Sequence, residues 1–284
     1  MIKLNGVGEL TAPVLVAAFE GWNDAGEAAS GVISHLGIEW NATPIAAMDP
    51  EDFYDFQVTR PVVEMSEGRT ERLVWPTTRF SVAKPDGFER DIVLVHGVEP
   101  NMRWRGFTDE LISGLTELGV EMVILIGALL ADSPHTRPVP VQVSGATSAL
   151  PSDVGSEPAD YKGSSGINGV LQFSLAEAEI PTVSLWASVP HYVATSPSPK
   201  ATLALLRAVE DVLDAPLPAG DLEEEARAWQ HGVEELASQD SDVAEYVRTL
   251  EEAKDATDLP EASGDAIARE FERYLRRRGD QNDG

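Results

Sequence analysis

Cysteine is absent from this chain of 284 residues. Its absence excludes disulfide bonds, thiol catalysis and cysteine-bound zinc, because each of these requires a cysteine sulfur. Chains without disulfides are typical of reducing compartments, so we expect the protein to be cytoplasmic. The first ten residues, MIKLNGVGEL, contain no long apolar run, so we expect no secretory signal.

Cations are scarce, because 21 Lys and Arg residues stand against 48 Asp and Glu residues, for a net charge of −27. Such a surface repels phosphate backbones and anionic lipids, which argues against nucleic acid and membrane as partners. No apolar run approaches the roughly 20 residues that a membrane-spanning helix needs. The carboxylates most simply keep the protein in solution, and the alternative is that they attract a basic protein surface.

The motifs that identify many enzymes are also absent. The chain has no phosphate loop of the form G-x-x-x-x-G-K-[ST], no H-E-x-x-H zinc helix and no G-x-S-x-G nucleophile elbow. Gly6-Val7-Gly8 lacks both the third glycine and the preceding strand of a dinucleotide-binding loop. We therefore expect no cofactor and assign no catalytic residue, although enzymes with sites assembled from separate loops remain open.

The stretch Pro13 to Leu36 carries the clearest pattern in the chain. An apolar run from Val14 to Phe19 predicts a buried strand, and a polar break from Glu20 to Asp24 follows it. Apolar residues then recur at helical spacing: Ala25, Ala28, Ala29, Val32, Ile33 and Leu36. In an open α/β sheet, a loop between such a strand and helix lies where ligands usually bind.

Similar units recur along the chain and define the fold class. Further buried strands are predicted at Asp91–His96, Val120–Gly127 and Thr182–Ala187. Helices are predicted at Gly106–Leu118, Ile167–Ala178 and Pro199–Leu213. Additional strands are predicted at Pro44–Met48, Phe80–Ala83 and Val139–Val143, with a β-hairpin from Val62–Met65 and Thr70–Trp75. This alternation predicts an α/β fold with a mainly parallel mixed sheet and helices on both faces.

The composition changes near Ala215–Gly220, beyond which the sequence predicts helices and no strand. We expect an α/β/α domain at residues 1–215 and an acidic helical C-terminal appendage at residues 216–284. Three apolar stripes indicate three helices in the appendage, around Leu222–Leu236, Val243–Leu250 and Ile267–Leu275. These stripes must pack on the main domain, on each other or on another subunit.

Two candidate sites follow the first two central strands. Glu20, Asn23 and Asp24 form a polar cluster that can bind a ligand or share a proton, and the alternative is a loop that caps the next helix. Glu20 needs a partner, because it directly follows a buried strand. Glu99, together with His96, can perform acid–base chemistry, and the alternative is a strand-terminal histidine beside a surface ion pair.

Further candidates lie in three later loops. His135 follows Asp132 at metal-ligand spacing, but without a readable third ligand we expect no metal site. His191 follows the strand that ends near Ala187. The glycine-rich helix start can bind an anion through its backbone N–H groups, or be merely a flexible loop; its residues are Lys162, Gly163, Ser164, Ser165 and Gly166. In a parallel sheet, Glu20, Glu99, His135 and His191 would lie along one rim.

The segment FEGWNDAGEAAS spans the end of the first predicted strand, the polar break and the start of the next helix. It resembles the N-terminal signature of the proteasome assembly chaperone 2 family, in its actinobacterial branch. The later segments VLVHGVEPNMRW, VILIGALLADSPHTRP, DYKGSSGINGVL and TVSLWASVPHYV match it in order and character. The resemblance extends over about residues 1–213, and the acidic helical tail also suits this branch.

The resemblance implies a three-layer α/β/α sandwich similar to the phosphorylase/hydrolase-like fold. It also implies self-association, with a trimer favoured by analogy with that fold, and it leaves a further protein partner open. Eukaryotic and archaeal relatives act as assembly chaperones for proteasome subunits, so the favoured hypothesis is a non-catalytic binding or assembly-chaperone-like protein. The alternatives are a small-ligand-binding protein or enzyme acting on an anionic metabolite at the sheet rim, and a homo-oligomeric scaffold assembled through the C-terminal helices.

Overall fold

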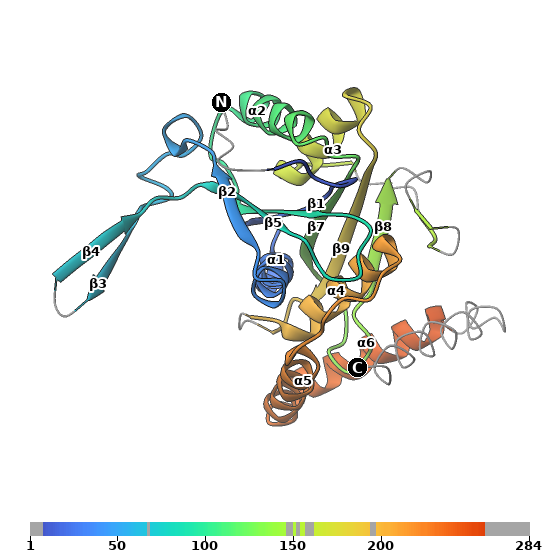
Figure 1. Ribbon diagram of the computed structural model, residues 1–284. Coiled ribbons are helices and arrows are strands. Elements are labelled where there is room, and N and C mark those ends of the chain that lie inside the picture. The colour runs from blue at the N-terminus through green and yellow to red at the C-terminus, as the bar shows by residue number, and fades with distance from the viewer. Residues whose placement is uncertain are drawn as a thin grey trace.

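The computed structural model describes residues 8–66, 69–145, 150–151, 154–156, 162–193 and 197–258 (Figure 1). One seven-stranded sheet, in the order β2-β5-β6-β1-β7-β9-β8, lies between two layers of helices. The predicted α/β/α sandwich with a mainly parallel mixed sheet is therefore confirmed. In the described part of the chain, no helix is long and apolar enough to cross a membrane.

The parallel strands occupy the centre of the sheet. They are β1 (Val14–Glu20), β6 (Ile92–Val98), β7 (Met122–Ala131) and β9 (Thr182–Pro190). Antiparallel strands flank them, with β5 (Thr78–Ala83) and β2 (Thr43–Ala47) beside β6 and β8 (Val141–Gly145) beside β9. The central strands are continuous apolar runs because both faces of the sheet are covered by helices.

The sheet divides the core into two hydrophobic clusters, and each cluster is covered by two helices. On one face, α1 (Ala28–Glu39) and α4 (Pro199–Leu213) pack on the sheet. On the other face, α2 (Trp104–Glu117) and α3 (Ile167–Glu177) do the same. Two short 3₁₀ turns, η1 (Ala25–Glu27) and η2 (Pro50–Asp52), precede α1 and follow β2.

Two further helices, α5 (Leu222–Ser238) and α6 (Ser241–Asp258), follow the sandwich. Leu217 and Leu222 belong to the same buried cluster as α1 and α4, so this segment packs on the main body. The third predicted helix, around Ile267–Leu275, lies outside the described residues. The division of the chain at residue 216 stays a prediction.

A β-hairpin projects from the body as an arm (Figure 1). We define the arm as β3 (Val62–Ser66) and β4 (Arg69–Val74), which pair with each other in a separate two-stranded sheet. The predicted hairpin is confirmed, and it does not join the main sheet. The arm is inserted between β2 and β5, so it leaves the order of the main sheet unchanged.

Two central strands are longer than the sequence predicts. We expected β7 to end near Gly127 and β9 to end near Ala187, but their pairing continues to Ala131 and Pro190. The two extensions hydrogen-bond to each other, so the expected loop from Ala128 begins only at Asp132. Periodicity could not show this, because the extension depends on a partner strand more than 50 residues away.

Gly97 provides a test of how closely β5 and β6 pack. A Cβ atom at this position would lie 2.5 Å from the backbone oxygen of Thr77 and 2.7 Å from the Cα of Thr78. Because backbone atoms cannot move aside as a side chain can, we expect Gly97→Ala to lower the free energy of unfolding by about 1–3 kcal/mol. Urea denaturation measures this change.

The matched control is Gly106→Ala in α2, where the added atom would meet only the ring of Phe53 at 3.9 Å. Alanine is the better helix former, so this control should leave stability unchanged or raise it slightly. Equal stability of the two variants would contradict the close packing at Gly97.

Candidate functional site

The loop from Gly21 to Asp24 lies at the carboxyl end of β1 and connects three neighbouring strands. The backbone N–H of Ala128 on β7 donates to the oxygen of Asn23 at 2.8 Å. On the other side, the N–H of Glu99, just past β6, donates to the oxygen of Glu20 at 3.0 Å. Gly21 has a φ of 107°, a conformation that favours glycine. The loop is therefore held in one backbone conformation by both neighbours.

The Glu99 carboxylate joins this loop to the start of α3. Its Oε1 accepts hydrogen bonds from Asn23 Nδ2 and from the backbone N–H of Ile167, each at 2.7 Å. A carboxylate at a helix N-terminus is favourable, because it faces the positive end of the helix dipole. Gly166 allows the approach, since a Cβ there would lie 2.2 Å from Asn23 Oδ1.

The predicted anion site at the start of α3 is thus occupied by a carboxylate of the protein itself. The structure brings Asn23, Glu99 and Gly166 together. The four residues before Gly166 are exposed on the surface beside them; they are Lys162, Gly163, Ser164 and Ser165. The sequence could not identify this contact, because Glu99 is 68 residues from Ile167 and 76 from Asn23.

Asp24 caps the first helix. Its Oδ1 accepts hydrogen bonds from the N–H groups of Ala29 at 2.7 Å and Ser30 at 3.2 Å. The sequence analysis offered helix capping as one interpretation of this loop. Asp24 is the residue that caps the helix, although the 3₁₀ turn η1 lies between them. Burial raises the pKa of the Asp24 carboxyl above its ordinary value.

Glu20 lies beside His96 on the neighbouring strand. Glu20 Oε1 is 3.0 Å from His96 Nε2, and this contact lowers the pKa of Glu20. The acid–base pair considered from the sequence joined His96 to Glu99, whereas the structure pairs His96 with Glu20. Both side chains are partly exposed, so the pair contributes little to stability.

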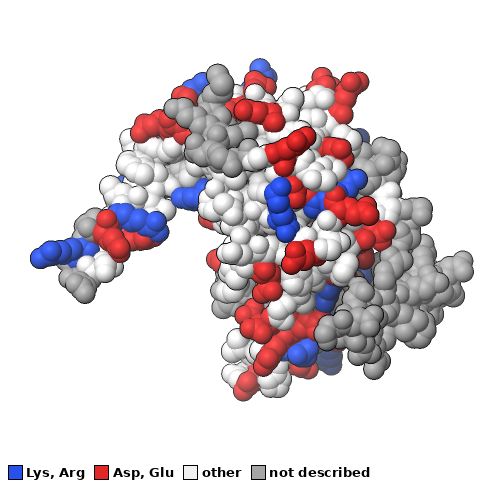
Figure 2. Space-filling view, viewed as in Figure 1, with Lys and Arg blue, Asp and Glu red and all other residues white. Residues whose placement is uncertain are grey.

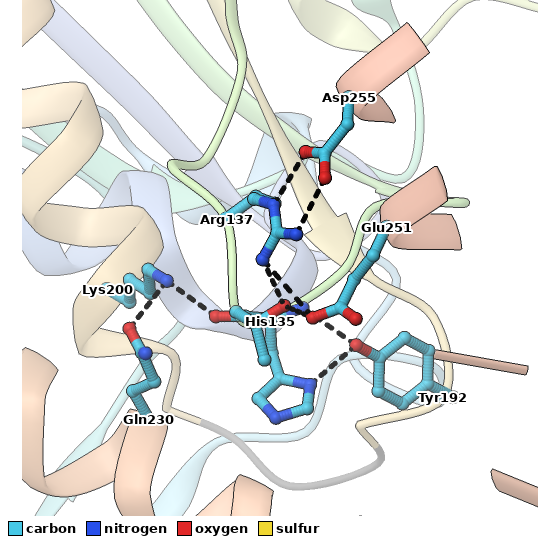
Figure 3. A network of polar contacts seen from close by, with 8 residues as sticks. His135, Arg137, Tyr192, Lys200, Gln230, Glu251 and Asp255 are labelled. Atoms are coloured by element: carbon cyan, nitrogen blue, oxygen red, sulfur yellow. Dashed lines mark hydrogen bonds and ion pairs between the residues drawn. The ribbon is translucent and has the colours of Figure 1, made fainter. Parts of the chain in front are cut away.

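His135 is the centre of a second cluster, beyond the ends of β7 and β9 (Figure 3). Its side chain is 2% exposed, and both its backbone N–H and its Nδ1 lie 2.7 Å from the Tyr192 hydroxyl. Lys200 donates to the backbone oxygen of His135 and to Gln230 Oε1. Burial lowers the pKa of His135 and lowers the pKa of Lys200 to about 8.

Ion pairs fasten α6 to this second cluster. Arg137 binds Asp255 through two parallel contacts of 2.8 Å and also contacts Glu251 at 3.2 Å (Figure 3). Asp132 accepts from the Tyr246 hydroxyl at 3.1 Å and lies 3.4 Å from His191 Nδ1. The loop candidates His135 and His191 therefore help to anchor the C-terminal helices.

The predicted convergence of Glu20, Glu99, His135 and His191 resolves into two separate groups. Glu20 and Glu99 flank the loop after β1, and both histidines lie in the cluster beside α6. None of the described contacts joins one group to the other. In the described part of the chain, no three His, Asp or Glu side chains are grouped as a metal site requires. The arrangement orients loops and helices.

Several exposed side chains near the carboxyl ends of the central strands are apolar, and the sequence analysis did not single them out. We call them the rim patch, and they are Trp22, Met102 and, on opposite faces of β7, Leu129 and Leu130. Trp22, at the tip of the braced loop, is 62% exposed. Ala128, which precedes two of them, pairs with Asp24 in the same loop. The sequence did contain one signal for this exposed surface. Trp22 is a large apolar residue in a polar loop, where neither the predicted strand nor the predicted helix requires one.

The chain is similar to proteins of known structure over most of its length. The model of the PAC2 family matches residues 18–237. A PAC2 family protein from Streptomyces avermitilis is 54% identical, with a TM-score of 0.77, over 83% of this chain and 99% of that chain. A proteasome-assembly chaperone homologue from Mycobacterium tuberculosis is 51% identical, with a TM-score of 0.76, over 82% and 99%.

An archaeal proteasome activator from Pyrococcus furiosus has the same fold, with a TM-score of 0.64 over 83% of this chain and 98% of that chain. Its 17% identity supports the fold alone. No functionally curated protein matches the sequence.

Removing the Glu99 carboxylate tests whether it braces the loop. We expect Glu99→Ala to lower the free energy of unfolding by about 2 kcal/mol, because the buried amide of Asn23 loses its acceptor. Glu99→Gln keeps an acceptor oxygen and loses only the charge at the helix N-terminus, so it should lose about 1 kcal/mol or less. Urea denaturation measures both. An undiminished stability of Glu99→Ala would contradict the structural role.

The depressed pKa of Lys200 predicts a pH dependence of stability. The ordinary lysine pKa is 10.5 and the folded value is about 8, so the unfolded state binds more protons between these pH values. The contribution of Lys200 to stability therefore rises with pH across this window and is lost as the pH falls through 8.

We expect the stability of the wild type relative to Lys200→Met to increase from pH 7 to pH 9.5, measured by thermal unfolding at each pH. Parallel curves for the two proteins would show that Lys200 keeps its ordinary pKa.

Proposed function

The chain belongs to the PAC2 family, and we propose that it is a non-catalytic protein-binding subunit resembling an assembly chaperone. Its contact surface in this proposal is the rim patch. The partner is another protein, and the class of partner suggested by the Mycobacterium tuberculosis relative, a proteasome-assembly chaperone homologue, is a proteasome subunit. The proposal includes a homo-oligomer, with a trimer expected by analogy with the fold, and a cytoplasmic location.

This proposal depends on one observation: at the rim, the polar side chains position the loop, and an apolar side chain faces outward. Glu20, Asn23, Asp24 and Glu99 contact other protein groups, and those contacts position the loop. The side chain that this loop directs outward is Trp22. Tryptophan is enriched among the residues that dominate protein–protein binding energy, because it buries a large area with little loss of conformational freedom. A braced loop that presents tryptophan suits protein docking.

An anionic metabolite at the rim is the weaker alternative. The backbone N–H of Ile167 at the start of α3 already donates to Glu99. An incoming phosphate or carboxylate would have to displace that side chain and break its hydrogen bond with Asn23. The described contacts therefore favour a protein partner over a small anion.

Trp22→Ala tests the proposed contact surface. The probes are purified α- and β-subunits of the proteasome from the same organism, with affinity measured by biolayer interferometry. We expect the wild type to bind one of them, and the variant to bind it about 30-fold more weakly, which corresponds to a hot-spot loss of about 2 kcal/mol.

Phe173→Ala is the matched control, because Phe173 is 67% exposed on α3, outside the rim patch. It should bind as the wild type does. Absence of binding by the wild type, or equal affinities for all three proteins, would refute the proposal.

A further inference from the structure

Helix α6 is attached to the loop after β7 by charged and hydroxyl groups. Arg137 of that loop contacts Glu251 at 3.2 Å and Asp255 at 2.8 Å, and Thr136 donates a hydrogen bond to Glu251 (Figure 3). The side chains of Arg137 and Glu251 are 33% and 23% exposed, so water reaches both. Partly exposed ion pairs contribute little free energy, because water solvates the same groups when they are apart.

The apolar contacts of α6 are separate from the main core. Among its described residues, the buried apolar side chains are Val247 and Leu250. Neither belongs to the two hydrophobic clusters that cover the faces of the sheet. The Tyr246 ring adds edge contacts with the rings of His191 and Tyr192, which follow β9. The sandwich would therefore keep both of its clusters if α6 left it.

Both α6 and the body on which it lies are acidic. Residues 241–258 contain six Asp and Glu residues and two Lys and Arg residues, a net charge of −4, so the remaining residues carry −23. Figure 2 shows Asp and Glu side chains across the visible face of the body. Like charges repel one another over a Debye length, which is roughly 10 Å at 0.1 M salt. Arg137 offsets this repulsion at the place where α6 contacts the body.

An element with few buried apolar contacts opens at a lower free energy than the core does. A two-residue turn, residues 239–240, joins α5 to α6 and can act as a hinge. Most of the stability of a helix in a protein comes from packing, so the amides of a lifted α6 would exchange with solvent. The opening of α6 is therefore measurable by hydrogen exchange.

We propose that α6 is an electrostatic clasp. It lifts from the sandwich as a unit while both core clusters stay folded, and Arg137 sets how often it lifts. Lifting frees the Tyr192 ring from Tyr246 and uncovers the loop after β7, which directly follows the strand end that carries Leu130. The inference is independent of the proposed function, because it concerns the attachment of α6 and no partner.

Arg137→Met tests the clasp, because it removes the charge and keeps most of the apolar stem. Hydrogen exchange of the full chain is followed by mass spectrometry. We expect the protection factors of residues 241–256 to fall at least tenfold, while those of β1 and α4 stay unchanged and show that the sandwich is folded. Arg137→Lys keeps the charge without the two parallel contacts, so its protection should be intermediate.

Arg248→Met is the matched control, because Arg248 is exposed on α6 itself and the same charge is lost. It should change the protection of α6 less than threefold. An equal loss in Arg137→Met and Arg248→Met would overturn the proposal. So would a wild-type α6 that is protected as strongly as β1, or one that exchanges as an unfolded peptide does.

Salt separates electrostatic attachment from simple packing by the Arg137 side chain. Raising sodium chloride from about 0.1 M to about 1 M shortens the Debye length from roughly 10 Å to roughly 3 Å. In Arg137→Met only the repulsion between α6 and the body is left to be screened, so we expect salt to restore the protection of α6 at least threefold. The wild type should change less, because salt also weakens its ion pairs.

If salt leaves the protection of α6 in Arg137→Met unchanged or lowers it, charge does not control the attachment, and the clasp is refuted. Neither experiment uses a proteasome subunit, so failure of the proposed function would leave their results intact.

Discussion

One carboxylate oxygen, Oε1 of Glu99, connects the parts of the rim. It accepts from the Asn23 amide and from the N–H at the start of α3, so a loop, a strand end and a helix share one acceptor. The charge is tolerated because the helix dipole and two donors replace water around it. The same contact explains why position 166 is a glycine, because the Cβ of any other residue would displace the Asn23 side chain. Without this acceptor, the loop that carries Trp22 would keep only its backbone hydrogen bonds to the neighbouring strands.

The two groups of polar residues perform similar tasks at different places. Around Glu99 they fix the loop after β1, and around His135 they fix α5 and α6 over the ends of β7 and β9. In both groups, hydrogen bonds that satisfy buried backbone and side-chain groups also set the positions of exposed elements. This explains how loops with many ionisable residues can belong to a binding protein: the ionisable groups hold the scaffold, and apolar side chains such as Trp22 face outward.

The fold was largely predictable from local patterns, whereas the site was not. The continuous apolar run of β1 and the helical spacing of α1 are short-range signals, and both elements were found with nearly correct ends. Asp24 was recognisable as a cap because its partners lie five and six residues away. The contacts of Glu99 cross from β6 to α3, and the extension of β7 depends on β9, so neither leaves a local pattern. The exposure of Trp22 likewise results from how three separate segments meet.

The arm is an insertion between two neighbouring strands of the main sheet, so its length and sequence can change without altering the core. Substitutions on the two strands of this insertion would therefore change what the hairpin can contact, while the sandwich and the loop that carries Trp22 stay the same.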